Sequence, residues 1–214
     1  MTERGEPKDD ALPVGLRYLP GRLDAGSRRR LLGEVLELVE AAGWFRPVMP
    51  GSGRPFSVRM CNLGRLGWIS DIRGYRYSPV HPGTGRPWPP IPEALLRLWE
   101  ELADYPHPPE CCLVNHYRPG ARLGLHQDRD EEEFTAPILS VSLGCAAWFR
   151  FGGRRRRDPT RRLLLESGDV LVMGGPARLL YHGIDRILPG TGEPVPGEGR
   201  INLTLRRVTV PERP

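Results

Sequence analysis

The chain has 214 residues, 39% of them hydrophobic, and a formal net charge of +5, which predicts one globular domain and argues against a disordered chain. Its 26 glycines and 24 prolines favour short strands joined by turns over a helical bundle, and the modest basic excess favours an anionic partner. No apolar run approaches the ~18 residues of a membrane span, and the polar first residues lack a signal-peptide core, so we expect a soluble, cytoplasmic monomer without a membrane partner.

Three stretches of the chain differ in composition. Residues 1–13 are charged and lack periodicity, which is typical of a loose N-terminal tail. Residues 14–110 contain two helical patterns, and residues 111–214 are rich in short runs of β-forming residues. We therefore expect a single globular domain over residues 14–210, in which the helices precede a β-rich core.

The first helical pattern covers residues 27–43. Its apolar residues recur at steps of three and four, which is the spacing of one face of an amphipathic helix. Asp24 or Ser27 can cap the start of this helix, and Gly43 can end it.

A second amphipathic pattern begins at Pro92 and ends before Tyr105. Proline is common in the first helical turn, where its missing N–H is not needed. We expect both helices to cover the same face of a sheet. Between them, residues 46–90 carry scattered Gly, Pro and aromatic residues, which predicts irregular loops and short hairpins.

Short β-type runs, each bounded by Gly, Pro or Asp, follow from Cys111 onward. They cover residues 111–117, 138–143, 147–151, 162–165, 170–173, 178–182 and 200–208. Their number and spacing predict an antiparallel barrel or a double-sheet jelly roll. The four cysteines show no metal-binding spacing and are expected to be buried free thiols.

Three side chains suited to binding a metal are distributed over two of these regions. His126 and Asp128 are two residues apart, so in an extended segment they project to the same face. His182 lies in a separate predicted strand. Two histidines and one carboxylate form the facial triad of non-haem iron(II) oxygenases, which leaves coordination positions open. Taken alone, the short pattern also fits histidines of the surface or the core.

The last predicted strand alternates polar and apolar residues. One of its faces would hold Arg200, Asn202, Thr204 and Arg206. An ordinary half-exposed strand has the same alternation, but Asn115 and Tyr117 also share a face of another predicted strand. Together these groups fit a small dicarboxylate, because guanidinium groups bind carboxylates through paired hydrogen bonds. His116 points the opposite way and is expected to be structural.

The H-x-D pattern, a distant histidine within R-x-x-Y-H-G and the R-x-N-x-T-x-R strand together resemble the AlkB-type dioxygenases. These enzymes use iron(II) and 2-oxoglutarate to demethylate alkylated nucleic-acid bases. The resemblance runs from about Met60 to Arg206 and includes shorter segments at residues 66–68, 74–79, 119–121, 136–138, 151–153 and 168–170. It implies a mostly β (α+β) fold: a double-stranded β-helix or jelly roll over residues 111–214, flanked by two N-terminal helices and a nucleotide-recognition lid within residues 14–110.

The resemblance also implies how the cofactors are held. It gives the iron ligands as His126, Asp128 and His182. It gives the 2-oxoglutarate contacts as Arg200 and Tyr117 at the distal carboxylate, Arg206 and Asn115 at the carboxylate beside the iron, and Asn202. With O2, such an enzyme would release formaldehyde, succinate and CO2 from bases such as 1-methyladenine or 3-methylcytosine.

Four further positions are implied to contact the substrate. Trp68 would stack on a flipped nucleotide, Tyr75 would contact the nucleotide, and Asp130 would approach the exocyclic amine of the base. Arg156 occupies a position that the family uses near the substrate. A cationic methylated base is attracted both to an indole ring and to a carboxylate. A core tryptophan is the alternative for Trp68.

Two charge runs flank these positions. The four arginines at 154–157 lie in a predicted loop, where they face phosphates or form a solvated basic hairpin; we favour phosphates. The three glutamates at 131–133 are expected to form a solvated turn.

The substrate itself stays open. Residues 69–72 and the Gly- and Pro-rich residues 188–199 depart from the family pattern, which leaves the substrate preference open. We expect repair of alkylated single- or double-stranded DNA, possibly RNA, and favour single strands because flipping a base then costs least. A second interpretation keeps the cofactors but changes the substrate to a protein side chain or small metabolite, which alkylated oligonucleotides would not stimulate. A third is a basic module that binds nucleic acid in a salt-dependent manner without binding iron.

Overall fold

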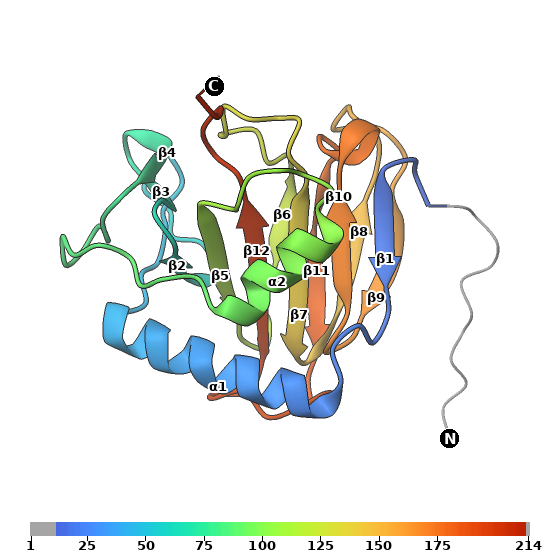
Figure 1. Ribbon diagram of the computed structural model, residues 1–214, viewed down its shortest axis with the longest axis horizontal. Helices are drawn as coiled ribbons and strands as arrows, with labels where there is room; N and C mark the ends of the chain where they lie inside the picture. Colours follow the sequence, from blue (N-terminus) through green and yellow to red (C-terminus); the bar gives the residue numbers. More distant parts are fainter. Residues whose placement is uncertain (1–11, 213–214) are drawn as a thin grey trace.

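A computed structural model describes residues 12–212, so nearly all of the predicted N-terminal tail lies outside the described residues. Two antiparallel sheets pack against each other, and two helices cover the outer face of the larger sheet (Figure 1). The predicted mostly β class with two N-terminal helices is therefore confirmed. Between residues 12 and 212, neither helix is long and apolar enough to span a bilayer.

The larger sheet has six strands. Their spatial order is β1 (Leu16–Leu19), β10 (Val170–Met173), β7 (Ile138–Gly144), β12 (Arg200–Arg206), β5 (Cys111–Tyr117) and β2 (Arg59–Leu63). Strand β12 lies between β7 and β5 and is buried along its whole length. Both edge strands of this sheet, β1 and β2, come from before residue 110, and its four central strands come from after it.

The smaller sheet has four strands. Their order is β6 (Leu123–His126), β11 (His182–Leu188), β8 (Ala146–Phe151) and β9 (Arg161–Leu165). A separate hairpin of β3 (Gly67–Asp71) and β4 (Gly74–Ser78) lies next to β2 and β5, at one edge of the larger sheet (Figure 1). Apolar side chains from the facing surfaces of both sheets form one of two core clusters.

Helix α1 (Ala25–Ala42) begins and ends where the sequence predicts. The side chain of Asp24 accepts a hydrogen bond from the Ser27 backbone N–H, at 2.7 Å, and Gly43 ends the helix with a φ of 97°, a conformation that glycine adopts without strain. Helix α2 (Glu93–Leu102) follows Pro92. Both helices contribute to the second core cluster together with β12 and its neighbours, so they cover one sheet face as predicted.

Two predictions for β-structure are wrong. Of the strand predicted over residues 178–182, only His182 lies in a strand: a short 3-10 helix (Gly175–Ala177) precedes this segment, and β11 begins at His182. Pro176 lies in this 3-10 turn, where its fixed φ fits a helical turn better than a ladder. Residues 46–90 do contain the expected hairpin, but they also contain β2, which pairs with β5 in the larger sheet.

The four cysteines are buried free thiols, as predicted. The alternation predicted for β12 is also confirmed. Ile201, Leu203 and Leu205 enter the core beneath the helices. The polar residues of the strand, from Arg200 to Arg206, face the space between the two sheets.

Candidate active site

A cavity of about 450 Å³ opens between the two sheets and beneath the β3–β4 hairpin. All residues that were predicted from the sequence to contact the iron, 2-oxoglutarate or the substrate line this cavity: His126, Asp128, His182, Asn115, Tyr117, Arg200, Asn202, Arg206, Trp68, Tyr75, Asp130 and Arg156. This size lies within the range of small-molecule sites, roughly 300 to 1,000 Å³. Segments far apart in the sequence therefore meet in one place.

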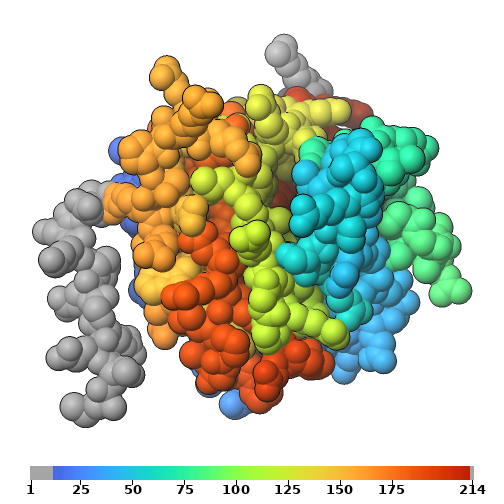
Figure 2. Space-filling model, turned by 180° about the vertical axis from the view of Figure 1, so that it is seen from behind, coloured from blue at the N-terminus to red at the C-terminus, as the bar shows by residue number. Residues whose placement is uncertain are grey.

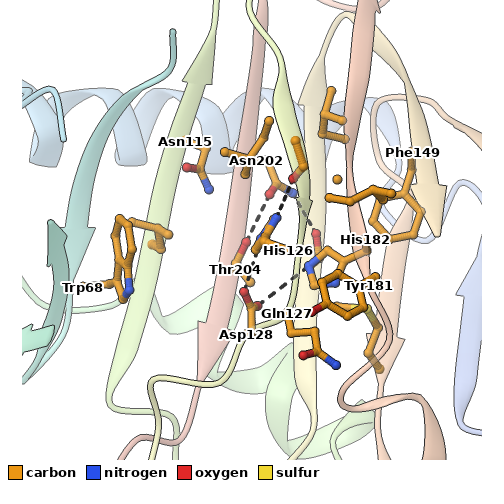
Figure 3. Close-up of a pocket in the computed structure, with 18 of the residues that line it drawn as sticks. Trp68, Asn115, His126, Gln127, Asp128, Phe149, Tyr181, His182, Asn202 and Thr204 are labelled. Carbon is orange, nitrogen blue, oxygen red and sulfur yellow. Dashed lines mark hydrogen bonds and ion pairs between the residues drawn. The ribbon is translucent and has the colours of Figure 1, made fainter. Parts of the chain in front are cut away.

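Three metal-competent side chains converge on one wall of the cavity (Figure 3). Pairing of β6 with β11 puts His126 directly opposite His182, and Asp128 follows two residues after β6 ends. Nε2 of His126 lies 3.4 Å from Oδ1 of Asp128, and Nε2 of His182 lies 3.9 Å from Oδ2. Neighbouring ligands of one ion, each at roughly 2.1 Å, are about 3 Å apart, so these atoms are close to ligation geometry.

Backbone contacts aim both imidazoles at the same point. Nδ1 of His126 lies 2.9 Å from the carbonyl oxygen of Gly124, and Nδ1 of His182 lies 3.0 Å from that of Leu180. A ring that donates through Nδ1 presents the lone pair of Nε2 to a metal. The carbonyl contacts therefore fix the tautomer needed for ligation.

The protonation states of the buried ligands suit a metal as well. Burial, reinforced by the neighbouring His126, lowers the pKa of His182 to about 4, so this imidazole is neutral at neutral pH. For Asp128, burial is the largest single influence and raises the pKa, but the charge of Arg206 and the contacts with His126 and His182 together outweigh it and hold the pKa of the carboxyl well below its ordinary value. Two nitrogen donors and one carboxylate with open space opposite match the donor set of an iron(II) facial triad.

A close backbone contact holds the two histidine strands together at Gly183. A Cβ at this position would lie 2.4 Å from the carbonyl oxygen of Leu123 and 2.8 Å from that of Gly124. We expect Gly183→Ala to push β6 away from β11, to weaken Fe(II) binding at least tenfold by separating His126 from His182, a loss of about 1.4 kcal/mol or more, and to lower the melting temperature. Gly33→Ala, at an exposed position of helix α1 where an added Cβ meets nothing within 4 Å, is the control for alanine itself. An unchanged metal affinity in Gly183→Ala would contradict this role.

Arg200 is a buried cation that forms no ion pair with a carboxylate of residues 12–212. Its side chain is fully buried, and it donates one hydrogen bond, from Nη2 to Oγ of Ser142 at 2.8 Å. Its Nε and Nη1 have no partner among residues 12–212. Burial lowers the pKa of Arg200 to about 10, so the guanidinium is still charged at neutral pH. A buried charge is costly unless it is paired, which indicates that an anion is the missing partner.

The hydroxyl of Tyr117 belongs to the same end of the cavity. Tyr117 pairs with Arg200 in the β5–β12 register, and it is almost fully buried. Burial raises the pKa of its phenol above the ordinary value, so the group is a neutral hydrogen-bond donor. A guanidinium and a phenol side by side form a site for one carboxylate.

Arg206 marks the opposite end of β12. It donates to Oδ2 of Asp128 from both Nε and Nη2, at 3.2 and 2.7 Å, whereas its Nη1 has no partner in the described chain. Oδ1 of Asn115 is likewise buried and unpartnered within residues 12–212. The strand thus presents one free donor group beside the three metal-competent side chains and another at Arg200, and these two ends fit the two carboxylates of 2-oxoglutarate.

Asn202 lies between the two arginines, and its amide is already engaged. Its Nδ2 donates to Oγ of Ser140 at 2.7 Å and to the carbonyl of Val141 at 3.0 Å, and its Oδ1 accepts from the hydroxyl of Thr204 at 3.1 Å. Protein groups therefore hold the amide in place, and Thr204 and Ser140 line the cavity together with it. The sequence did not single out Ser140 or Ser142.

The β3–β4 hairpin brings aromatic side chains to the mouth of the cavity. The rings of Trp68 and Tyr75 stack with centroids 5.4 Å apart and an interplanar angle of 22°. Nε1 of Trp68 donates to Oδ2 of Asp130 at 2.8 Å. Figure 3 shows Trp68 across the cavity from the metal-competent side chains, so a planar group between them would be close to the metal.

Arg156 forms another part of the mouth. Its Nη1 donates to the carbonyl of Leu125 at 2.9 Å, and its guanidinium lies over the ring of Tyr181. The neighbouring Arg154, Arg155 and Arg157 are exposed. From behind, their loop (orange) lies beside the yellow-green segment that includes residues 126–128, and the hairpin (cyan) lies on the other side of that segment (Figure 2).

The prediction of a solvated turn at residues 131–133 is wrong. Glu131 and Glu133 are buried, and only Glu132 is exposed. Glu131 forms ion pairs with Arg178 at 3.1 Å and with Arg206 at 3.3 Å. A run of acidic residues looks the same in sequence whether water or arginine surrounds it. A lone arginine in the apolar segment around Arg178 is the signal that a buried acidic partner exists.

His116 points away from the cavity, as expected. Its ring packs against Trp44, with centroids 5.4 Å apart. Burial, together with the charges of Arg59 and Arg118, lowers the pKa of His116 to about 4. A neutral imidazole packed in this way is a structural group.

Comparisons with known proteins agree with this geometry. The sequence model of the 2OG-Fe(II) oxygenase superfamily matches residues 15–206. The chain is 58% identical to the alpha-ketoglutarate-dependent dioxygenase AlkB homolog of Caulobacter vibrioides, over 90% of this chain and 87% of that protein. It is 43% identical to the alpha-ketoglutarate-dependent dioxygenase AlkB of Escherichia coli, over 94% of each chain.

The fold also matches a solved structure. The structure of OsALKBH1 superposes with a TM-score of 0.80 at 30% sequence identity, and the match covers 92% of this chain and 98% of that one.

Proposed function

Because the chain belongs to the 2OG-Fe(II) oxygenase superfamily and is an AlkB-type dioxygenase, we propose that it repairs alkylated nucleic acid by oxidative demethylation of 1-methyladenine and 3-methylcytosine. The observation that carries the proposal is the aromatic hairpin and carboxylate that lie across one cavity from the facial triad. A site for the cofactors thus faces a site suited to a flat cationic ring.

The chain's own residues position the reactants. His126, Asp128 and His182 would hold the iron, which together with 2-oxoglutarate and O2 supplies the oxidation of a methyl C–H bond. Arg200 with Tyr117 would bind the distal carboxylate of 2-oxoglutarate, and Arg206 with Asn115 the end beside the iron. The buried walls of the cavity exclude water from this centre.

The chemistry of the mouth supports a cationic base as the substrate. The indole of Trp68 offers a stacking surface. The carboxylate of Asp130 accepts a hydrogen bond from Trp68 and forms no ion pair with an arginine among residues 12–212. A methyl group on N1 of adenine or N3 of cytosine makes the ring cationic, which strengthens both contacts relative to the neutral base. We propose that this charge separates damaged from undamaged bases.

The surface beside the mouth supports a polyanionic substrate. Four consecutive arginines, at 154–157, lie next to the cavity and are exposed, and arginines in such positions bind phosphates. We propose DNA as the main partner, with RNA as an alternative, and a preference for single strands because no base pair has to be broken. We place this activity in the cytoplasm, where the four free thiols stay reduced.

Formaldehyde release tests the proposal. Matched DNA and RNA oligonucleotides with a single 1-methyladenine or 3-methylcytosine should yield formaldehyde and succinate in a 1:1 ratio, expected from the stoichiometry of an oxidative demethylation, only with Fe(II) and 2-oxoglutarate present. Unmethylated oligonucleotides of the same sequence should not stimulate succinate formation. Stimulation by free amino acids or lipids, with no response to methylated oligonucleotides, would refute the proposed substrate.

The stacking role of Trp68 gives a further prediction. Trp68→Leu should raise the KM for a methylated oligonucleotide by roughly 5- to 150-fold, since base stacking on an aromatic ring contributes about 1–3 kcal/mol. The affinity for 2-oxoglutarate should not change, because Trp68 lies on the opposite side of the cavity. Trp148→Leu, on a strand face outside the cavity, is the matched control. An unaltered KM in Trp68→Leu would show that Trp68 packs the core instead.

A further inference from the structure

A buried carboxylate lies between the hairpin and the cosubstrate site. Glu131 accepts a hydrogen bond from the hydroxyl of Tyr77 at Oε1, and the same oxygen lies 3.3 Å from Nε of Arg206. Its other oxygen accepts from Nη2 of Arg178 at 3.1 Å. Both oxygens are thus occupied by donors of the protein, so Glu131 acts through these neighbours and not by binding a ligand.

One end of this series of contacts lies in the β3–β4 hairpin, which carries Trp68 at the mouth of the cavity. Tyr77 on β4 is the direct cross-strand partner of Trp68 on β3. Trp68 bonds to Asp130, the residue next to Glu131. Two adjacent hairpin side chains therefore bond to two adjacent residues of the segment that follows the metal ligand Asp128.

The other end is the cosubstrate site. Arg206 lies between the carboxylates of Glu131 and Asp128, and its free Nη1 is the group available to 2-oxoglutarate. Arg178 binds the backbone carbonyl of Asp128 at 2.7 Å. The side chains of Arg206, Glu131 and Arg178 are 2–6% exposed. Breaking a buried ion pair leaves a charge without a partner, which is energetically costly. A movement of the Glu131 side chain is therefore expected to move Arg206 with it.

We propose that Glu131 is a positioning residue that ties the β3–β4 hairpin to Arg206, so that a base under Trp68 and 2-oxoglutarate beside Asp128 favour each other's binding. The inference rests on the proposed function, because it needs a base as the hairpin ligand. Coupling of this kind is reciprocal: 2-oxoglutarate tightens oligonucleotide binding by the same factor as the oligonucleotide tightens 2-oxoglutarate binding.

Binding without turnover measures the coupling. With Mn(II) in place of iron, the Kd of an oligonucleotide with one 1-methyladenine is measured by fluorescence anisotropy, with and without 2-oxoglutarate. In the wild-type protein 2-oxoglutarate should lower this Kd by about fivefold or more. In Tyr77→Phe, which removes only the hydroxyl that reaches Glu131, the factor should fall towards one, while the Kd for 2-oxoglutarate alone stays within about twofold of wild type.

Tyr18→Phe is the matched control. It also removes a hydroxyl bonded to a buried carboxylate, that of Asp169, but at a place outside the cavity, and it should keep the wild-type factor. A wild-type factor of one, or an unchanged factor in Tyr77→Phe, would overturn the proposal.

A second variant tests the cosubstrate end without any nucleic acid. Glu131→Gln keeps the shape of the side chain but removes the charge that faces Arg206 and Arg178, and calorimetry should show a Kd for 2-oxoglutarate raised by roughly tenfold. The exposed neighbour gives the control, Glu132→Gln, which should bind as wild type. Wild-type affinity in Glu131→Gln would refute the positioning role. A protein that binds 2-oxoglutarate but no oligonucleotide would refute the proposed function, and the calorimetry would still decide the role of Glu131.

Discussion

Replacing His126 by alanine is expected to abolish Fe(II)-dependent succinate formation. The variant would lose one of the three proposed iron ligands, and even the loss of an outer partner of a metal ligand costs roughly 10- to 100-fold in metal affinity or activity. We therefore expect at least a 100-fold loss of metal affinity, about 2.7 kcal/mol. Metal titration by calorimetry and succinate release measure the two effects.

The same variant should fold normally. The side chain of His126 is 35% exposed, and Asp128 keeps its ion pair with Arg206 when the imidazole is gone. The melting temperature of the metal-free protein is therefore expected to change little. His107→Ala, at an exposed position outside the cavity, serves as the control. Wild-type turnover in His126→Ala would remove His126 from the metal site.

Replacing Arg200 by methionine should separate function from stability. The variant would lack the charge that we propose binds the distal carboxylate of 2-oxoglutarate, and two charge-assisted hydrogen bonds contribute about 1.5–3 kcal/mol each. The Kd for 2-oxoglutarate should rise by at least roughly 100-fold. Calorimetric titration of the metal-loaded protein measures this loss.

The free energy of unfolding of the metal-free Arg200→Met protein should not decrease, in contrast to its affinity for 2-oxoglutarate. Arg200 is fully buried and bonds only to Ser142 among the described residues, so an apolar side chain of similar length relieves an unpaired charge. Such replacements are neutral or stabilise by about 1–4 kcal/mol, and urea unfolding should show a free energy of unfolding equal to or above that of wild type. Arg97→Met, on the exposed side of α2, is the control. A strong loss of stability with intact 2-oxoglutarate affinity would mean that Arg200 is structural.

Local patterns explain why much of this fold is predictable from sequence. Strands β5 and β10 have the predicted bounds, because buried β-type runs between turn residues leave little choice. The alternation of β12 fixes which of its residues face the cavity. Helix α1 carries its own start and stop signals at Asp24 and Gly43.

Features that depend on distant partners were missed. Strand β2 has buried side chains on both faces and no alternation, and only its pairing with β5 gives it a place in the sheet. The 3-10 turn before His182 follows from Pro176, which also leaves Arg178 free to reach Glu131. No local sequence pattern around Glu131 indicates that Arg178 and Arg206 are its ion-pair partners. Pairwise contacts of this kind are decided by the tertiary fold and not by local propensity.

A crystal structure of the protein with Mn(II) and 2-oxoglutarate tests the account most directly. We expect one metal ion bound to Nε2 of His126, to the carboxylate of Asp128 and to Nε2 of His182, at about 2.0–2.2 Å. The distal carboxylate of 2-oxoglutarate should contact Arg200 and Tyr117, and its other end should lie beside Arg206. A metal bound elsewhere, or a cosubstrate that leaves the Arg200 guanidinium unpaired, would contradict it.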